Sequence, residues 1–343
     1  MRIFFSLKYS AQLAQLKLSK RCYISVATGY GHIAEKIKEG LEALGHEIVE
    51  DVSEAKSCDL EFYIGQPTFK ESPVIRPAVI LTMFETTRCP EFWIESINKY
   101  DLMINPSEWG RKCFKEQGVE IPIEVIPLGF DPDRFPVMHR PERETWTFYW
   151  QGLALHDRKG FKWVLEAFKQ LNLPKSRLIA KVIPLAKPGT VFELKIYPVY
   201  EEQRWEEIRI VNARLSWEEM RRLLFEADVS CYPSSGEGFG LLPLEHMATG
   251  LPVILTNYSG MAQQCNPEVN FPLDYEEVFS GYAGTGGKCA RPNFEQLKEF
   301  MLWTYENREA AREKGLKAAE WVRERFTWDK LIPLYEQALK EVL

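Results

Sequence analysis

The fold of this chain is decided by the stretch Ser235-Gly236-Glu237-Gly238-Phe239-Gly240-Leu241-Leu242-Pro243-Leu244-Glu245-His246-Met247-Ala248-Thr249-Gly250. It follows the short apolar run Val229–Tyr232 and places Glu237 and Glu245 eight positions apart around a glycine-rich turn. Apolar residues then recur with helical spacing, at Leu241, Leu244, Met247 and Ala248. The pattern therefore predicts a strand, a glycine turn and a helix, which is the repeating unit of a parallel α/β sheet.

These glycines and carboxylates have two interpretations. Gly238 and Gly240 allow backbone N–H groups to approach a phosphate at the helix start, where the helix dipole is positive. Glu237 lies before the helix and Glu245 lies one turn inside it, so they can bind hydroxyl groups at opposite ends of one ligand. A sugar nucleotide has such a shape, because hydroxyls flank its diphosphate. The alternative is an ordinary strand–loop–helix turn with two solvated glutamates.

The stretch and its continuation into Leu251-Pro252-Val253-Ile254 resemble the E-x7-E element of retaining GT-B glycosyltransferases, the large family 4 group. Other segments resemble further motifs of this family in the same order. These are Gly29-Tyr30-Gly31-His32 (N-domain glycine loop), Met83–Thr87 and Asp101–Glu108 (acceptor-side segment), Val125–Asp131 (linker), Arg158-Lys159-Gly160 (basic phosphate motif) and Phe326-Thr327-Trp328 (start of the last helix). The resemblance covers most of the chain and implies the GT-B architecture, two Rossmann-like doubly wound α/β domains with an interdomain cleft.

Two series of short apolar runs alternate with helical patterns, which predicts parallel sheets with helices on both faces. The predicted strands are Cys22–Ala27, Leu60–Ile64, Val79–Met83, Leu102–Asn105 and Ile123–Pro127, then Trp146–Gln151, Leu178–Ile183, Ile208–Val211, Val229–Tyr232 and Val253–Thr256. A proline-rich segment from Asp131 to Pro141 marks the boundary. We expect an acceptor-side domain over 1–138, a donor-binding domain over 139–325, and a helix over 326–343 that packs back on the first domain. The quoted motifs follow predicted strands, where such sheets bind ligands.

The length and composition of the chain limit the classes of protein and partner to consider. The 343 residues, 45% of them hydrophobic, suit two domains of ordinary size, and the net charge of −6 argues against a nucleic-acid partner. Seven scattered cysteines without a C-x-x-C pair are typical of buried thiols in a reducing compartment, so we expect a cytoplasmic protein. No run of 18 apolar residues occurs, and no membrane-spanning helix is predicted.

Residues 1–21 stand ahead of the first predicted strand as a basic extension. They carry Arg2, Lys8, Lys17, Lys20 and Arg21, and no acid occurs before Glu35. Three interpretations stay open. The extension is an added surface helix, strand or tail, or it makes a peripheral membrane contact through its basic charges, or it is a cleaved targeting peptide.

The resemblance implies a role for each candidate site residue. Arg158 and Lys159 would stabilise the charge that develops on the leaving diphosphate. Glu237 would bind hydroxyls of the donor sugar and Glu245 the ribose diol. The remaining donor-side positions are Gly238, Phe239, Gly240 and Leu241, the facing residues Gly29, Gly31 and His32, and Arg214 in the base-binding loop; Glu85 and Thr86 would hold the acceptor.

Several of these residues have structural alternatives. His32 can be a core histidine or a helix cap, and Glu85 can form an ordinary ion pair. The family often has an arginine directly after the glycine of the preceding strand, whereas this chain has Gly152-Leu153, so Arg158 would take that role. The segment Ser216–Glu219 also predicts a helix capping box.

The sequence Asp131-Pro132-Asp133 resembles the D-x-D metal motif of the other major glycosyltransferase fold, but its proline-bounded setting favours turn-forming aspartates. The resemblance implies a UDP- or GDP-sugar as co-substrate, no bound cofactor, no required metal, and a glycan, lipid or small-molecule acceptor. It also implies retention of anomeric configuration, with the leaving phosphate taking the acceptor proton. The rival predictions are a non-catalytic sugar-nucleotide-binding protein and another GT-B enzyme, such as a nucleotide-sugar epimerase or a phosphorylase.

Overall fold

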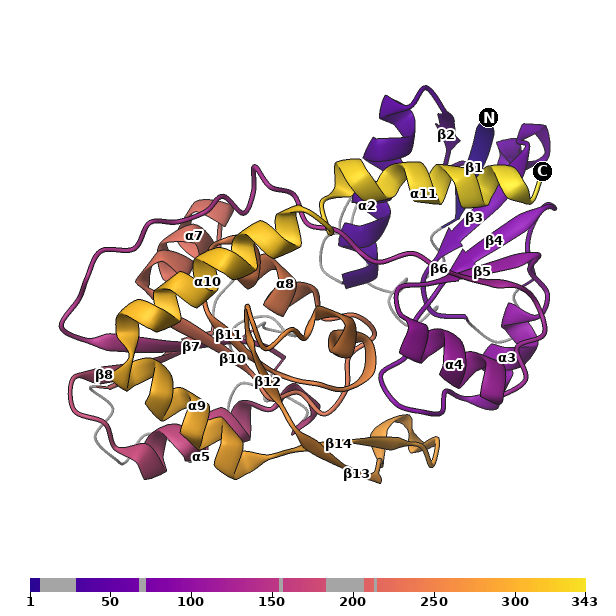
Figure 1. Cartoon of the computed structure of the whole chain (residues 1–343). Coiled ribbons are helices and arrows are strands. Elements are labelled where there is room, and N and C mark those ends of the chain that lie inside the picture. The colour runs from indigo at the N-terminus through magenta and orange to yellow at the C-terminus, as the bar shows by residue number, and fades with distance from the viewer. Residues whose placement is uncertain (7–28, 68–71, 154–156, 183–206, 213–214) are drawn as a thin grey trace. The chain divides into compact units, whose positions relative to one another are not determined.

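The computed structural model describes residues 1–6, 29–67, 72–153, 157–182, 207–212 and 215–343 (Figure 1). The chain divides into two compact units. The first comprises Met1–Gly129, Phe279–Lys288 and Phe326–Leu343, and the second comprises Phe130–Val278 and Cys289–Arg325. The units first join at Gly129 and Phe130, whereas the predicted domain boundary lies between residues 138 and 139.

The first unit is built on a six-stranded parallel sheet with the order β2-β1-β3-β4-β5-β6. Its strands are β1 (Arg2–Ser6), β2 (Glu47–Val49), β3 (Leu60–Ile64), β4 (Ala78–Leu81), β5 (Leu102–Asn105) and β6 (Ile123–Val125). Every residue of β3, β4 and β5 is buried. Strands that are covered on both faces consist of nearly continuous apolar residues. The apolar runs in the sequence therefore predicted the positions of these three strands closely.

Helices and short 3-10 turns surround this sheet. They are α2 (Gly29–Ala43), η1 (Val52–Ser57), α3 (Glu91–Ile97), α4 (Glu108–Glu116) and the last helix, α11 (Trp328–Glu341). Trp93 of α3 and Phe114 of α4 share one apolar core with Ile80 and Met103 of the sheet.

The last helix belongs to the first unit, although its chain arrives from the second. It packs on α2 so closely that a Cβ atom on Gly40 would lie 2.4 Å from Cγ1 of Ile332. His46 Nε2 lies 2.8 Å from Oε1 of Glu336, and the buried Tyr335 hydroxyl lies 3.1 Å from the Pro127 carbonyl. Glycine at position 40 is therefore required by this helix contact.

The first strand does not lie where the sequence pattern placed it. β1 is Arg2–Ser6, in the interior of the sheet, and the predicted strand Cys22–Ala27 lies outside the described residues. Ile3, Phe4 and Phe5 are buried, so the chain begins with the kind of apolar run that a strand buried on both faces requires. The prediction of a basic extension over 1–21 was therefore wrong for residues 2–6.

The charged side chain of Arg2 forms ion pairs within the first unit. Its guanidinium donates to Glu47 at 2.9 Å and to Glu54 at 2.8 Å, which ties β1 to β2 and η1. The other basic residues of the predicted extension lie outside the described residues; they are Lys8, Lys17, Lys20 and Arg21.

The second unit is built on another six-stranded parallel sheet, with the order β12-β11-β10-β7-β8-β9. Its strands are β7 (Trp146–Gly152), β8 (Ser176–Val182), β9 (Ile208–Asn212), β10 (Val229–Tyr232), β11 (Val253–Thr256) and β12 (Phe271–Leu273). The chain runs outward from β7 to β9 and then restarts at β10 on the other side of β7. The carboxyl ends of β7 and β10 therefore form the topological switch point, where sheets of this kind bind ligands.

The helices of the second unit are α5 (Phe161–Leu171), α7 (Trp217–Glu226), α8 (Leu241–Ala248), α9 (Phe294–Glu306) and α10 (Arg308–Arg323). Short 3-10 turns follow β7 and β11, at η2 (Asp157–Lys159) and η3 (Ser259–Gln264). The sequence did not predict a further two-stranded sheet, β13 (Tyr275–Phe279) with β14 (Lys288–Pro292), which encloses η4 (Tyr282–Gly284). Among the described helices, none has the length and apolar character needed to cross a membrane.

Candidate functional site

Two segments that follow strands at the switch point of the second unit bring their charged side chains together. Lys159, which ends η2 after β7, donates from Nζ to both carboxylate oxygens of Glu237, at 2.8 and 2.6 Å. Arg158 Nη1 lies 3.3 Å from Oε2 of Glu237 and donates to the Gly236 carbonyl at 2.6 Å. The basic motif and the first glutamate of the glycine-rich stretch, which are 78 residues apart, thus form one cluster.

Backbone contacts fix this cluster. Gly160 has a left-handed conformation (φ 76°), and a Cβ atom on it would lie 2.2 Å from the Pro233 carbonyl oxygen. The Ser235 N–H donates to the Arg158 carbonyl at 2.7 Å, and the Trp150 indole donates to the Lys159 carbonyl at 3.0 Å. Only glycine allows the start of α5 to approach the chain after β10 so closely.

The electrostatics of Glu237 follow from its two cationic neighbours. The side chains of Arg158 and Glu237 are each 12% exposed, and that of Lys159 is 19% exposed. Burial by itself raises the pKa of Glu237, but the charges of Lys159 and Arg158 and hydrogen bonds from Lys159 and Ser234 outweigh it and hold this pKa below its ordinary value. Glu237 is therefore a carboxylate, and two cations around one carboxylate leave a net positive charge that suits an anion.

The glycine turn before α8 is held by η3. Gly240 has φ 96°, and a Cβ atom on it would lie 2.7 Å from Cγ of Met261. The Gln264 side chain donates to the carbonyls of Phe239 and Gly240, at 2.8 and 3.1 Å. Because these bonds fix the turn, the backbone from Gly238 to Leu241 has a defined conformation at the start of α8.

Two further bonds to η3 fix the backbone of the catalytic candidate Glu237. Its N–H donates to Oγ of Ser259 at 2.9 Å, and its carbonyl accepts from the Gly260 N–H at 3.0 Å. Ser259 was not among the residues predicted from the sequence. A signal was present, because Ser259 and Gly260 follow the apolar run Val253–Thr256 just as Glu237 follows Val229–Tyr232.

The second glutamate has a different environment. Glu245 lies inside α8 with only 9% of its surface exposed. Burial raises its pKa to about 8, and the charge of Arg134 opposes the shift. The neighbouring His246 is a core residue, since Nδ1 lies 2.9 Å from Ser230 Oγ and 3.1 Å from the Tyr232 hydroxyl, and burial lowers its pKa to about 3.

The candidates from the N-terminal glycine motif lie in the first unit. Gly29, Gly31 and His32 form the first turn of α2 itself, so the prediction that these glycines make a loop was wrong. A Cβ atom on Gly29 would meet nothing within 4 Å. The sequence analysis missed Tyr30, whose hydroxyl accepts from the Met83 N–H at 3.0 Å and lies 2.9 Å from the Met83 carbonyl. Tyr30 thereby ties the start of α2 to the segment after β4.

The acceptor-side candidates follow β4 in the same unit. The Thr86 hydroxyl is buried and donates to the Arg88 carbonyl at 2.9 Å, so it holds the turn. Glu85 is partly buried, and its charge adds to burial in raising the pKa of Tyr30. Of the two, Glu85 is the better candidate for a contact with a hydroxyl ligand.

The remaining sequence-based candidates are a base-loop arginine and a metal motif. Arg214 lies outside the described residues, but the predicted capping box is confirmed: the Glu219 N–H donates to Ser216 Oγ at 3.2 Å, and the Ser216 N–H donates to Glu219 at 2.7 Å. In the D-x-D segment, Oδ1 of Asp131 accepts from the Asp133 N–H at 3.0 Å, which makes a turn. The described part of the chain contains no cluster of three or more His, Cys, Asp or Glu side chains with metal-ligand geometry.

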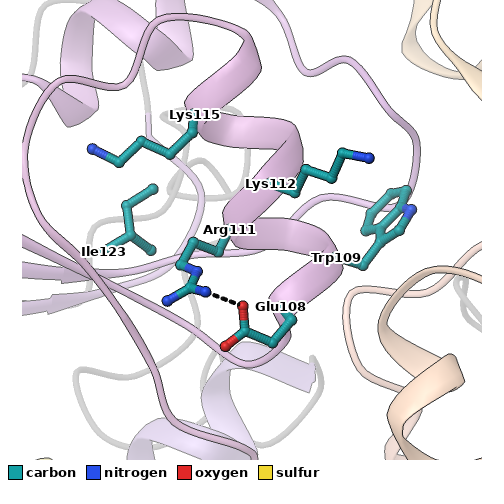
Figure 2. A pocket seen from close by; sticks show the side chains of 6 residues that line it. All are labelled: Glu108, Trp109, Arg111, Lys112, Lys115 and Ile123. Atoms are coloured by element: carbon teal, nitrogen blue, oxygen red, sulfur yellow. Dashed lines mark ion pairs between the residues drawn. The ribbon is translucent and has the colours of Figure 1, made fainter.

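A shallow hollow of about 690 Å³ lies on the first unit and contains none of these candidates (Figure 2). It is lined by Glu108, Trp109, Arg111, Lys112, Lys115 and Ile123. Its cations are already engaged. Arg111 pairs with Glu108 at 2.5 Å, and Lys115 donates to the Ile121 carbonyl at 2.8 Å. We assign the hollow no ligand, because the charged cluster of Arg158, Lys159 and Glu237 lies elsewhere, at the switch point of the second unit.

Part of the chain matches a known protein family. Residues 153–315, which include both charged segments and α8, match the family described as glycosyl transferases group 1. This match covers slightly less than half of the chain. The chain is similar to the MMP alpha-(1->4)-mannosyltransferase of Mycolicibacterium hassiacum, 25% identical over 229 residues (64% of this chain, 49% of that protein). It is also similar to the O-antigen chain mannosyltransferase B of Escherichia coli, 27% identical over 249 residues (68% and 59%). The chain thus spans about half the length of the curated relatives it matches.

Solved structures show the same fold over the whole chain. The Anabaena protein Alr3699/HepE, solved in complex with UDP and glucose, has a TM-score of 0.69 at 15% identity and covers 99% of both chains. Sucrose-phosphate synthase of Thermosynechococcus elongatus has a TM-score of 0.70 at 14% identity, again with 99% of both chains covered. The predicted fold class, two doubly wound α/β sheets of the GT-B type, is therefore confirmed.

Proposed function

We propose that this protein transfers a sugar from a nucleoside-diphosphate sugar to an acceptor hydroxyl. The observation that carries this proposal is the cluster of Arg158, Lys159 and Glu237 at the switch point of the second unit, within the matched family domain. A donor of this class presents a diphosphate and hydroxyls, which are the groups that such a cluster and a helix start would bind. The second unit is accordingly the donor-binding domain in this proposal, and the first is the acceptor-side domain.

Each donor-side group has one task. Lys159 and Arg158 stabilise the charge that grows on the leaving diphosphate as the bond to the anomeric carbon breaks. The backbone from Gly238 to Leu241 binds phosphate and sugar. Glu237 accepts hydrogen bonds from hydroxyls of the donor sugar, and Glu245 binds the ribose diol. In the free protein Lys159 is held by Glu237, so the ammonium already has its position when the donor arrives.

We further propose retention of configuration, in which the leaving phosphate oxygen accepts the acceptor proton on the same face. In this scheme no nucleophilic carboxylate is required, in contrast to the paired carboxylates of retaining glycosidases. Charge neutralisation by side chains replaces a divalent metal in this proposal. Gly31 and His32 at the start of α2 face the donor, and Glu85 binds the acceptor hydroxyl.

The donor and acceptor classes come from the relatives. UDP was found with Alr3699/HepE, and two curated relatives are named mannosyltransferases, so UDP and GDP conjugates of glucose and mannose are the first donors to test. The acceptor is a glycan, a lipid or a small molecule. We propose a cytoplasmic location, because each described cysteine is a free thiol. A peripheral membrane contact would involve Lys8, Lys17, Lys20 and Arg21.

A thermal-shift panel of UDP, GDP, ADP, CMP and their sugar conjugates, without added metal, tests the donor site. A ligand at about 100 times its Kd stabilises its protein by about 2.7 kcal/mol, which is a shift of several degrees. Donor hydrolysis or transfer is then followed with the responding nucleotide. A response to none of them, with or without Mg²⁺ or Mn²⁺, would refute the donor site and favour the non-catalytic alternative.

A further inference from the structure

The tip of the β13–β14 hairpin is anchored on the predicted acceptor-side turn. Lys288 opens β14 and belongs to the first unit; its N–H donates to Oγ1 of Thr87 at 2.8 Å, and its carbonyl accepts from the Thr87 N–H at 3.1 Å. The ring of Tyr282 lies 5.9 Å from that of Phe84. A Cβ atom on Gly287 would lie 2.8 Å from the Arg88 nitrogen, so the hairpin approaches this turn too closely for a larger residue to fit there without a shift.

The same strand is anchored two residues later on the donor-side loop. Ala290 is buried and belongs to the second unit, and its N–H donates to the Ser235 carbonyl at 2.8 Å. The Ser235 N–H in turn donates to the Arg158 carbonyl at 2.7 Å. The Ser235 backbone is therefore hydrogen-bonded through both its carbonyl and its N–H. Ser235 precedes Glu237 by two residues.

Only Cys289 separates the two anchors along the chain. An extended chain rises about 3.3 Å per residue, so the backbone atoms of Lys288 and Ala290 lie about 7 Å apart and the link has little slack. If both anchors stay bonded, a displacement of the turn at Thr87 would strain the hydrogen bond on Ser235. No side-chain rearrangement is needed in between.

We propose that β14 is a positioning strand that couples the acceptor-side turn at Glu85–Thr87 to the donor-side loop at Ser235–Glu237. This inference rests on the function proposed above, because that proposal assigns acceptor and donor to the two anchors. Binding at either anchor changes the affinity at the other by the same factor, as linkage requires. The residues Lys288 and Ala290 act through Glu237 and its loop and do not touch substrate.

The coupling is tested first without any ligand, by amide hydrogen exchange. Thr87→Val is nearly isosteric and removes the acceptor of the Lys288 N–H. We expect the amides of Ser235 and Ala290, which do not contact Thr87, to exchange about fivefold faster, the factor given by the loss of one net hydrogen bond. Thr285→Val is the control, since Thr285 lies in the same hairpin and its hydroxyl donates only locally, to the Tyr282 carbonyl at 3.3 Å. Unchanged exchange at both amides in Thr87→Val would overturn the coupling.

A second arm uses saturating UDP and a variant with two glycines inserted between Lys288 and Cys289. In the wild type, UDP should slow amide exchange both at Gly238–Leu241 and at Lys288. In the lengthened variant the slowing at Gly238–Leu241 should remain and that at Lys288 should vanish. Slowing at Lys288 in the lengthened variant would overturn the coupling. If UDP does not slow exchange at Gly238–Leu241 in either protein, the donor site is refuted. The coupling is then still decided by the exchange measured on Thr87→Val without ligand.

Discussion

Replacing Glu245 by glutamine should stabilise the free protein at neutral and alkaline pH. Burial raises the pKa of Glu245 to about 8, whereas its ordinary value is 4.5. The folded state therefore keeps a proton that the unfolded state releases between these two values. The free energy of unfolding of the wild type consequently falls as the pH rises from about 4.5 to about 8, and this loss is absent below that window.

The size of the effect follows from the shift. Each pKa unit corresponds to about 1.4 kcal/mol, so a shift from 4.5 to about 8 corresponds to a ceiling of about 5 kcal/mol above pH 8. The side chain is 9% exposed, and relaxation and water entry in the real protein reduce such a cost, so we expect at least about 2 kcal/mol. For a unit of this size that is a rise in Tm of about 4 to 8 °C.

The assay is thermal unfolding of wild type and Glu245→Gln from pH 5 to pH 8.5, without nucleotide. The Tm difference should be small at pH 5, where the carboxyl is protonated in the folded protein, and should widen as the pH rises. Glu299→Gln, at an exposed position on α9, is the matched control and should show no such trend. A Tm difference that does not change across this range would refute the electrostatic reasoning. The same variant should bind UDP more weakly, because the contact to the ribose diol is altered.

The other predictions concern the charge cluster, the glycines and metal. Lys159→Ala should lower turnover by roughly two to three orders of magnitude with the fold intact; Lys169→Ala, at the other end of α5, should not, and equal rates for the two would exclude the phosphate role. Gly240→Ala should destabilise by about 1–3 kcal/mol, because of its left-handed backbone and the close side chain that faces it, whereas Gly29→Ala should stabilise α2 by about 0.5–1 kcal/mol, as measured by denaturant unfolding. EDTA should leave turnover unchanged; loss of activity that Mg²⁺ or Mn²⁺ restores would make Asp131 and Asp133 candidate metal ligands again.

Much of the sheet framework follows from the sequence because parallel strands covered on both faces need unbroken apolar runs. Such runs located β3, β5, β10 and β11 to within a residue. The described strands that were not predicted are β1, the three-residue edge strands β2 and β12, and the β13–β14 hairpin. β1 was missed because residues 1–21 were interpreted as a basic extension, with the first strand placed at Cys22–Ala27, although Ile3–Phe5 is an apolar run. The β13–β14 hairpin was missed because its first strand is largely exposed and carries no apolar alternation.

The placement of the charge cluster was predictable for a topological reason. Arg158 and Glu237 both follow apolar runs, and in a doubly wound sheet the ends of those strands meet, whatever the number of residues between them. The individual hydrogen bonds of these residues were not predictable, although the position of Ser259 after the apolar run Val253–Thr256 was a signal for a place near the site. Ser259 reaches the Glu237 N–H through the geometry of a 3-10 turn, and Tyr30 reaches Met83 across two elements; no local pattern specifies either bond.

The two glutamates of the glycine-rich stretch show most clearly what a motif leaves out. They are the same residue type, eight positions apart, yet two cations hold the pKa of Glu237 below its ordinary value while burial raises that of Glu245. Environments that shift the pKa values of two carboxyl groups in opposite directions suit the two groups to different roles. Glu237 stays charged and holds Lys159, which in the proposed reaction stabilises the leaving diphosphate. Glu245 keeps its proton near neutral pH, so in the proposed reaction it can donate to one hydroxyl of a diol and accept from the other. This division of roles depends on side chains far away in the sequence, and it is the fold that supplies them.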